Sequence, residues 1–374
     1  MSVFASREGC AGELVSNTNV IVDAAGRWFL RSGIQEQNGG VARFYRSDLQ
    51  RNANVSTEIT GYAIGTLLFL YQRTGQSEYL NAAIASARFL TRTAWNARLS
   101  SFPFEYPVDG SGPLAYFFDS GIIVRALLAT WRVTNETEFR DVAVVAGRGM
   151  SSDFKAREAI HPILSLPDKR PLGYEQRWSA CPGAYQLKAA LAWYDLYETT
   201  GEMSFLRDYE FALEGALGNE ADFLAKEPER DRIMDRLHAY TYFLEGLLPM
   251  LHRADCAHAF RAGLDRAATY LREIAPQFAR SDVYAQMLRA RIYGEKLGSI
   301  PLDMTAATHE ASEAATFQLA SDDARVDGGF GFGRKASGMM PFVNPVSTGF
   351  CTQALASWND RNNQVLAVCR HDLI

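Results

Sequence analysis

The stretch that decides the fold is TEITGYAIGTLLFLY at residues 57–71, which begins with polar and small residues and then becomes apolar around its whole circumference. A helix that is apolar on every side is buried on every side. Five further segments have the same design, and their starts recur at intervals of about 45 to 65 residues, a period typical of arrays of helical hairpins. They are residues 114–131, 180–197, 236–251, 281–298 and 344–358.

Helices of a second kind are predicted between the buried ones. In residues 77–95, the side chains of Leu80, Ile84, Ala87 and Leu90 form one apolar stripe opposite a polar face, which indicates a helix at the surface. Six buried and six amphipathic helices therefore alternate, and they predict a closed inner ring covered by an outer ring. The other amphipathic segments are residues 136–154, 202–226, 256–278, 302–321 and, paired with the last buried helix, 14–34.

Composition excludes several classes of protein. The chain has 374 residues, 47% of them hydrophobic, and a net charge of −5. These values are ordinary for a globular protein, and no basic run indicates a nucleic-acid partner. No apolar run reaches the roughly 18 residues of a membrane span. We expect a single domain over residues 1–374, and the sequence does not indicate an oligomeric state.

The cysteines indicate neither disulfides nor a metal. Five cysteines are scattered without zinc-binding spacing, so we expect reduced thiols in a cytoplasmic protein, with no metal and no cofactor. His252, Asp255, Cys256 and His258 lie close together in sequence, but we expect a loop there rather than a metal site.

Three motifs carry a resemblance to a known superfamily. Residues 39–44 (GGVARF), 57–62 (TEITGY) and 327–331 (DGGFG), the last followed by NPVST at 344–348, resemble the loops and inner-helix starts of the six-hairpin, or (α/α)6-toroid, superfamily. The resemblance covers nearly the whole chain and implies an all-α (α/α)6 toroid with short β-hairpins in its loops. It also implies carbohydrate chemistry, because members include glycoside hydrolases, polysaccharide lyases, sugar epimerases and glucuronyl C5-epimerases.

Two other interpretations of these motifs are weaker. Terpene cyclases also have α/α toroids, but their Asp-x-Asp-Asp signature is absent from this chain. The glycine run at residues 328–333 lacks the preceding strand and following helix of a dinucleotide-binding loop. We expect this run to form a tight loop that needs positive φ angles and a close backbone approach.

Candidate catalytic residues lie mainly on the fourth buried helix. His238, Tyr242 and Glu245 are spaced so that they share one helix face, and His and Tyr can exchange protons. Tyr240 and, at the start of the fifth buried helix, Tyr284 are further candidates. A self-satisfied polar network in the core is the alternative for these side chains.

Candidate substrate-binding residues lie at the starts of the other inner helices and in the loops beside them. Helix N-termini carry free N–H groups and suit anionic or hydroxyl-rich ligands. Trp178 can stack on a pyranose and Arg177 can pair with a carboxylate. The alternative for Glu58 is an acid in the first helical turn that complements the helix dipole, and the alternative for Asp119 is a helix cap. The remaining candidates are Tyr185, Arg289, Arg334 and Asn344.

Two chemistries fit these residue types. A glycosidase needs two carboxylates, and the candidates are Glu58, Asp119, Glu175, Glu245 and Asp282, among which the sequence selects no pair. A uronate lyase or epimerase needs a Tyr or His base and an Arg beside the substrate carboxylate. We therefore expect a carbohydrate-active enzyme, an epimerase, lyase or hydrolase, that acts on a sugar or polysaccharide, including those with uronic acids. The alternatives are a non-catalytic toroid that binds a glycan or a protein, and a terpene-cyclase-like protein.

Overall fold

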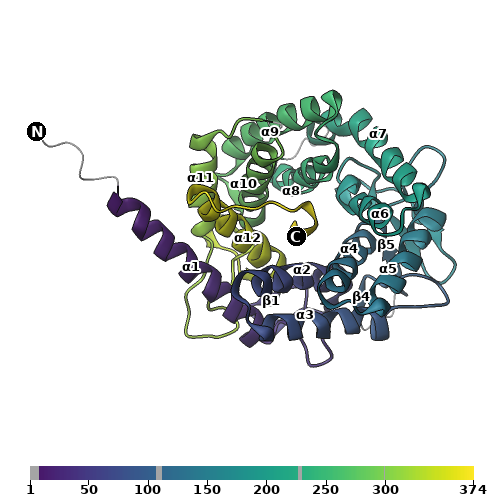
Figure 1. The fold of residues 1–374 in the computed structure, drawn as a ribbon, viewed down its shortest axis with the longest axis horizontal. Coiled ribbons are helices and arrows are strands. Elements are labelled where there is room, and N and C mark those ends of the chain that lie inside the picture. Colours follow the sequence, from purple (N-terminus) through teal and green to yellow (C-terminus); the bar gives the residue numbers. More distant parts are fainter. Residues whose placement is uncertain (1–7, 107–111, 226–229, 299) are drawn as a thin grey trace, which may run out of the picture.

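The computed structural model describes residues 8–106, 112–225, 230–298 and 300–374. In these ranges the helices form two concentric rings, as the sequence predicts (Figure 1). The inner ring consists of α2 (Thr57–Thr74), α4 (Phe117–Thr134), α6 (Gln186–Thr200), α8 (Arg230–Gly246), α10 (Ser281–Lys296) and α12 (Pro345–Asn362). The outer ring consists of α1 (Glu8–Arg31), α3 (Ser77–Phe89), α5 (Thr137–Gly149), α7 (Met203–Ala225), α9 (Ala254–Ile274) and α11 (Met304–Ala315).

The two ends of the helical array close the ring by packing together. Helix α1 contacts α12, the pairing that the sequence predicts for residues 14–34, and α12 also contacts α2. Trp28 of α1 is buried, and its indole Nε1 donates a hydrogen bond to the carbonyl oxygen of Arg325 at 2.9 Å. The six hairpins therefore form a continuous toroid, and the predicted (α/α)6 architecture is confirmed.

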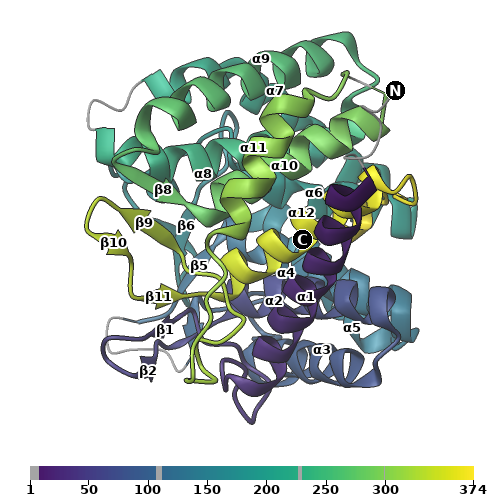
Figure 2. The same cartoon turned by 90° about the vertical axis from the view of Figure 1, so that its left-hand side faces the viewer.

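Short antiparallel strands lie before several inner helices, and the strands gather on the side of the ring that is drawn on the left of Figure 2. In three cases a strand of the described ranges runs directly into the start of a helix, β3 into α2, β5 into α4 and β8 into α10, and only the N-cap Asn344 separates β11 from α12. The strands thus fix where these helices begin. Their bounds are β1 Tyr45–Arg46, β2 Arg51–Asn52, β3 Val55–Ser56, β4 Glu105–Tyr106, β5 Leu114–Tyr116, β6 Ile163–Ser165, β7 Arg170–Pro171, β8 Phe278–Arg280, β9 Gly333–Lys335, β10 Gly338–Met339 and β11 Phe342–Val343.

Some predicted boundaries were wrong. Residues 114–116 are strand β5, because they pair with β6, so α4 begins three residues later than predicted. Residues 181–185 form a turn that contains Pro182, and α6 begins only at Gln186. The loop expected at residues 252–258 ends early, because α9 begins at Ala254 and carries Asp255, Cys256 and His258 in its first turns.

Two glycine loops bring the chain against the backbone of an outer helix. Gly328 has a φ of +84°, and a Cβ atom there would lie 2.3 Å from the carbonyl oxygen of Ala24 in α1. Gly39 has a φ of +91°, and a Cβ atom would lie 2.3 Å from the carbonyl oxygen of Ala85 in α3. Only glycine fits both requirements, so the expected tight loop at residues 328–333 is confirmed at Gly328.

We predict that Gly328→Ala destabilises the protein far more than Gly338→Ala. Both glycines have positive φ, but a Cβ at Gly338 would meet nothing within 4 Å. The control substitution should therefore cost only backbone strain, about 1 to 2 kcal/mol. Gly328→Ala should cost at least about 2 kcal/mol more, because α1 must also move. Chemical denaturation measures both values, and equal losses would contradict the close approach.

Candidate active site

A cavity of about 380 Å³ lies at the N-terminal end of the inner ring. Five inner helices contribute to it through their first turns or through residues that precede them. The sixth, α8, contributes His238 and Tyr242, which lie about two and three turns inside its start. Free N–H groups and positive helix dipoles therefore point toward one space. The lining residues are Arg43, Phe44, Glu58, Ile59, Phe104, Tyr116, Phe118, Asp119, Pro162, Arg177, Trp178, Ser179, Tyr185, His238, Tyr242, Arg280, Asp282, Phe332, Phe342, Asn344 and Val346.

Eight of the thirteen candidate residues from the sequence line this cavity. His238 and Tyr242 do so from α8, as expected, and their rings meet edge to face with centroids 4.6 Å apart. Their catalytic role stays a prediction. The other six lie around them and come from four different parts of the ring: Glu58, Asp119, Arg177, Trp178, Tyr185 and Asn344.

Three of the candidates that do not line the cavity are polar side chains with partners elsewhere. Tyr240 turns away from His238, because two residues rotate a helix position by about 200°. Its hydroxyl donates to Glu220 Oε2 at 2.5 Å, between α8 and α7. Glu245 and Arg289 pair with each other at 2.5 Å and are fully buried in the middle of the ring.

The other two candidates face the outer ring. Tyr284 packs against the rings of His309 and Phe317, with centroids 6.1 and 6.3 Å away. Arg334 pairs with Glu313 of α11 at 3.1 Å. Tyr284 therefore joins α10 to α11, and Arg334 joins strand β9 to α11, so neither side chain lines the cavity.

Glu58 and Asp119 are the two acids at the starts of α2 and α4. Neither is the capping residue of its helix: Ser56 caps α2 through its hydroxyl, and α4 has no side-chain cap. Asp119 is buried, and within the described chain its Oδ2 atom has no hydrogen-bond partner. Capping therefore does not explain Asp119, whereas Glu58 lies in the first turn of α2, where an acid complements the helix dipole.

Burial makes both carboxyl groups retain protons. It raises the pKa of Glu58 to about 7, although the nearby Arg43 guanidinium opposes this effect. Burial also raises the pKa of Asp119 well above its usual range, and the negative charge of Glu58 raises it further. Two carboxyl groups that repel each other's charge in this way titrate as a pair and hold one proton between them at intermediate pH.

His238 is held as a neutral imidazole. Its Nδ1 atom lies 2.8 Å from Gln286 Oε1 and 3.4 Å from Asp282 Oδ2, and both of these atoms are acceptors. The proton therefore sits on Nδ1, and Nε2 keeps its lone pair. Burial and the Arg280 charge lower the pKa of His238 to about 4, so the ring is uncharged at neutral pH.

The sequence interpretation missed two arginines of the cavity. Arg280 holds Asp282 through two hydrogen bonds of 3.0 and 2.6 Å. Arg43 lies over the Phe104 ring at 5.2 Å and 3.4 Å from Glu105. The sequence could have indicated Arg43, because it is the one charged residue in the GGVARF motif. Only the tertiary fold, however, shows that this loop reaches the cavity.

The one group of three potential metal ligands in the described ranges lies at the other end of the ring. It consists of Asp195, Glu198 and His371. Both acids already pair with guanidinium groups, Asp195 with Arg125 at 3.1 Å and Glu198 with Arg370. These guanidinium groups already neutralise the carboxylates that a metal ion would need as ligands, so we assign no metal there. None of the helices that the structure describes is long and apolar enough to cross a membrane.

We predict a pH-dependent gain of stability from Glu58→Gln. Because the folded-state pKa of about 7 exceeds the ordinary value of 4.5, ionisation of Glu58 costs folding free energy as pH rises through this range. The difference in the free energy of unfolding, variant minus wild type, should be larger at pH 8 than at pH 4.5 by about 1 to 3 kcal/mol. Glu138→Gln is the control with the opposite sign, because hydrogen bonds from Arg92 lower the pKa of Glu138. Denaturant melts at both pH values test this, and a pH-independent difference for Glu58→Gln would contradict the raised pKa.

Comparison with known proteins supports the architecture. No protein-family model and no curated protein matches the chain. Among solved structures, it is similar to a cellobiose 2-epimerase from Spirochaeta thermophila, with 13% identity over 96% of this chain and 100% of the other, at a TM-score of 0.72. A sugar epimerase from a ruminal bacterium is 11% identical over 91% of this chain and 98% of its own, with a TM-score of 0.68. An unsaturated glucuronyl hydrolase from Bacillus sp. GL1 is 14% identical over 91% of this chain and 96% of its own, with a TM-score of 0.61. The chain therefore shares the (α/α)6-toroid fold of these proteins.

Proposed function

We propose that this protein is a carbohydrate-active enzyme, and specifically a hydrolase of glycosides that carry an acidic sugar. The observation that carries this proposal is the pair of carboxyl groups of Glu58 and Asp119 in one cavity: burial raises both pKa values, and the negative charge of Glu58 raises that of Asp119 further. Hydrolysis of a glycosidic bond needs one protonated and one ionised carboxyl group on opposite sides of that bond. A pair that shares one proton near neutral pH supplies both forms at once.

The environment of each acid suggests its role. Asp119 is only 5% exposed and feels the charge of Glu58, so it is the group that keeps the proton and donates it to the leaving oxygen. Glu58 is less deeply buried, and its pKa is raised only to about 7, so it is the carboxylate that activates water or stabilises the developing positive charge. The Arg43 guanidinium opposes the effect of burial at both carboxyl groups, whereas the negative charge of Glu58 raises the pKa of Asp119 further.

The rest of the lining fits an acidic sugar. Arg43 and Arg177 are guanidinium groups at the cavity wall, and a guanidinium pairs with a carboxylate through two parallel hydrogen bonds. Trp178, Tyr185 and Phe118 supply ring faces for the apolar side of a pyranose. The similar solved structures include sugar epimerases and a glucuronyl hydrolase, which supports a sugar ligand, and a uronic acid among the candidates.

Other functions fit less well. A non-catalytic binding module has no need for titratable groups with shifted pKa values, and a terpene-like substrate has no need for charged walls.

The free cysteines of the described chain agree with the proposed cytoplasmic location.

We predict that Glu58→Gln and Asp119→Asn each lower turnover at least about a hundredfold, the usual scale for a lost general acid or base. A panel of neutral and uronate-ended oligosaccharides is assayed for new reducing ends. Glu175→Gln, which removes an exposed acid in the loop beside the cavity, is the matched control and should keep full activity. Turnover within threefold of the wild type in either acid variant, with normal melting, would remove the pair from the mechanism.

A second candidate function is epimerisation, and the neutral His238 with a free Nε2 favours it. A base of this kind can abstract a proton from a sugar carbon. If it does so, His238→Ala and Tyr242→Phe should each reduce turnover at least about a hundredfold. The same panel followed by NMR in deuterated water separates the reactions: deuterium at an inverted carbon without cleavage indicates an epimerase, an unsaturated product a lyase, and a new reducing end alone a hydrolase.

A further inference from the structure

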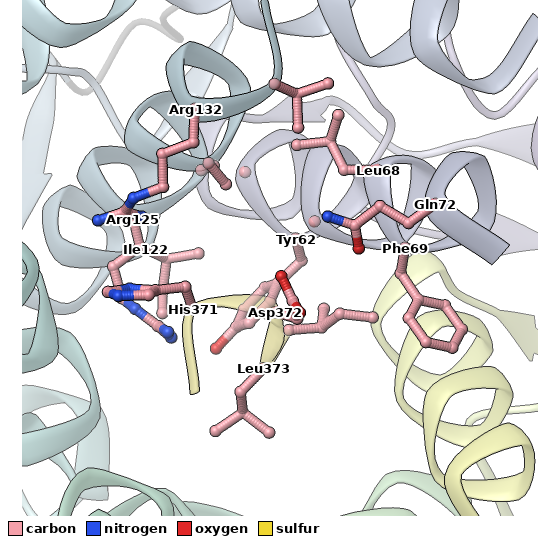
Figure 3. Close-up of a pocket in the computed structure, with 16 residues that line it drawn as sticks. Tyr62, Leu68, Phe69, Gln72, Ile122, Arg125, Arg132, His371, Asp372 and Leu373 are labelled. Atoms are coloured by element: carbon pink, nitrogen blue, oxygen red, sulfur yellow. The ribbon is translucent and has the colours of Figure 1, made fainter. Parts of the chain in front are cut away.

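The end of the inner ring opposite the cavity is closed by the chain itself. Residues 370–374 enter the ring there, so that the chain end marked C lies at its centre in Figure 1. Leu373 and Ile374 are 4% and 5% exposed. In Figure 3, His371, Asp372 and Leu373 lie between Arg125 and Arg132 of α4 on one side and Gln72 of α2 on the other.

Side chains of four inner helices bind this segment through its backbone. Arg125 of α4 donates to the carbonyl oxygen of Arg370 at 3.2 Å. Gln353 of α12 donates to the carbonyl oxygen of Asp372 at 2.5 Å and accepts from the Ile374 N–H at 3.2 Å. Lys188 of α6 and Arg289 of α10 donate to the Ile374 oxygen at 3.0 and 3.3 Å. The segment therefore cross-links the inner helices in the way that a bound ligand would.

The two side chains that donate to the tip of the segment belong to a buried cluster of charged residues. Lys188 and Arg289 both pair with Glu245, at 2.8 and 2.5 Å, and all three side chains are fully buried. Two cations thus share one carboxylate, and the Ile374 oxygen supplies a further acceptor. Removal of that acceptor would leave Lys188 Nζ with Glu245 as its acceptor and Arg289 Nη1 with Gln353 Oε1, at 2.8 and 3.0 Å. Each buried donor would thus lose one hydrogen bond, which is costly.

One layer of aromatic rings separates this charged group from the cavity. The Arg289 guanidinium lies 3.9 Å from the centroid of the Phe350 ring. Phe350 in turn meets Tyr62 at 5.3 Å and Tyr242 at 6.5 Å, and Tyr242 lines the cavity. A displacement of Arg289 therefore reaches the cavity floor through two side chains.

Space beside the segment allows it to move. A second cavity, of about 80 Å³, lies between α2, α4 and residues 371–374, and Arg132 and Gln72 are among its walls (Figure 3). Arg132 Nη1 is buried there without a hydrogen-bond partner in the described chain. The segment is thus held at its tip and, through Arg370 and His371, by acids of α6, with unfilled space on its α2 and α4 side.

We propose that residues 370–374 act as an internal strap, which closes the far end of the inner ring and holds Lys188, Glu245 and Arg289 in place beneath the cavity floor. Release of the strap loosens α8, α10 and α12, and with them the wall that carries His238 and Tyr242. This inference does not depend on the proposed reaction, and its test needs no substrate.

Hydrogen exchange measured by mass spectrometry on the full chain tests the strap. Leu373→Asp places a charge in a buried position and should release the segment, whereas Val365→Asp changes a residue of the same tail that is 69% exposed. We expect exchange in residues 236–246, 281–296 and 345–357 to become at least tenfold faster in Leu373→Asp only, with α3 and α5 unchanged. Faster exchange confined to residues 363–374, or spread evenly over all helices, would overturn the proposal.

A second measurement covers the case in which Leu373→Asp does not fold. Ala126 is buried in the wall of the second cavity, so a thiol placed there by Ala126→Cys is shielded by the strap. In this background the milder Leu373→Ala should raise the rate of maleimide labelling at position 126 at least tenfold, read from the digested peptide. Val365→Ala is the matched control. Equal labelling rates in both variants would show that the segment does not act as a strap.

Discussion

Helices that are apolar around their whole circumference impose the architecture of this protein. Such a helix cannot lie at a surface, so each one needs neighbours on all sides. Six of them, placed side by side, cover one another's flanks, and six amphipathic helices cover the outside. Most inner helices also have polar starts, and the ring geometry collects these starts around one cavity. The packing requirement of the core thus creates the polar site.

The cavity sets two electrostatic effects against each other. Positive helix ends and Arg43 favour ionised carboxylates, and a helix end contributes typically about 0.3 to 1 kcal/mol. Burial opposes ionisation and can shift a pKa by several units. At Glu58 and Asp119 burial prevails, since both pKa values are raised. At Asp282 burial also raises the pKa, but the bidentate contact with Arg280, together with His238, outweighs it and leaves the pKa lowered. Acids of one chemical type therefore acquire different protonation states within a single site.

The sequence pattern predicts the rings and their closure because helical periodicity and burial are local properties of the chain. It also predicts that His238 and Tyr242 face the cavity, since polar residues on an otherwise apolar helix need a wet region inside the ring. Their helix, however, begins at Arg230, before the predicted start at residue 236, so they lie well inside it. The pattern errs at Glu245, which shares their face but lies about 10 Å further along the axis than His238, because each residue adds 1.5 Å. Arg43 shows the opposite limit: its loop reaches the cavity only through contacts with distant segments, which no local pattern contains.

The pairing of α1 with α12 has a consequence for how the protein folds during synthesis. These helices close the ring, although α1 ends at Arg31 and α12 begins only at Pro345. The hydrogen bond from Trp28 of α1 to Arg325, which precedes α12, likewise joins residues that lie 297 positions apart. Neighbouring hairpins can form as soon as they leave the ribosome, because their contacts are local. The ring itself stays open until the last inner helix has emerged, so an apolar flank of α2 faces solvent during most of translation. Chaperone binding at that flank is the natural protection for such a chain.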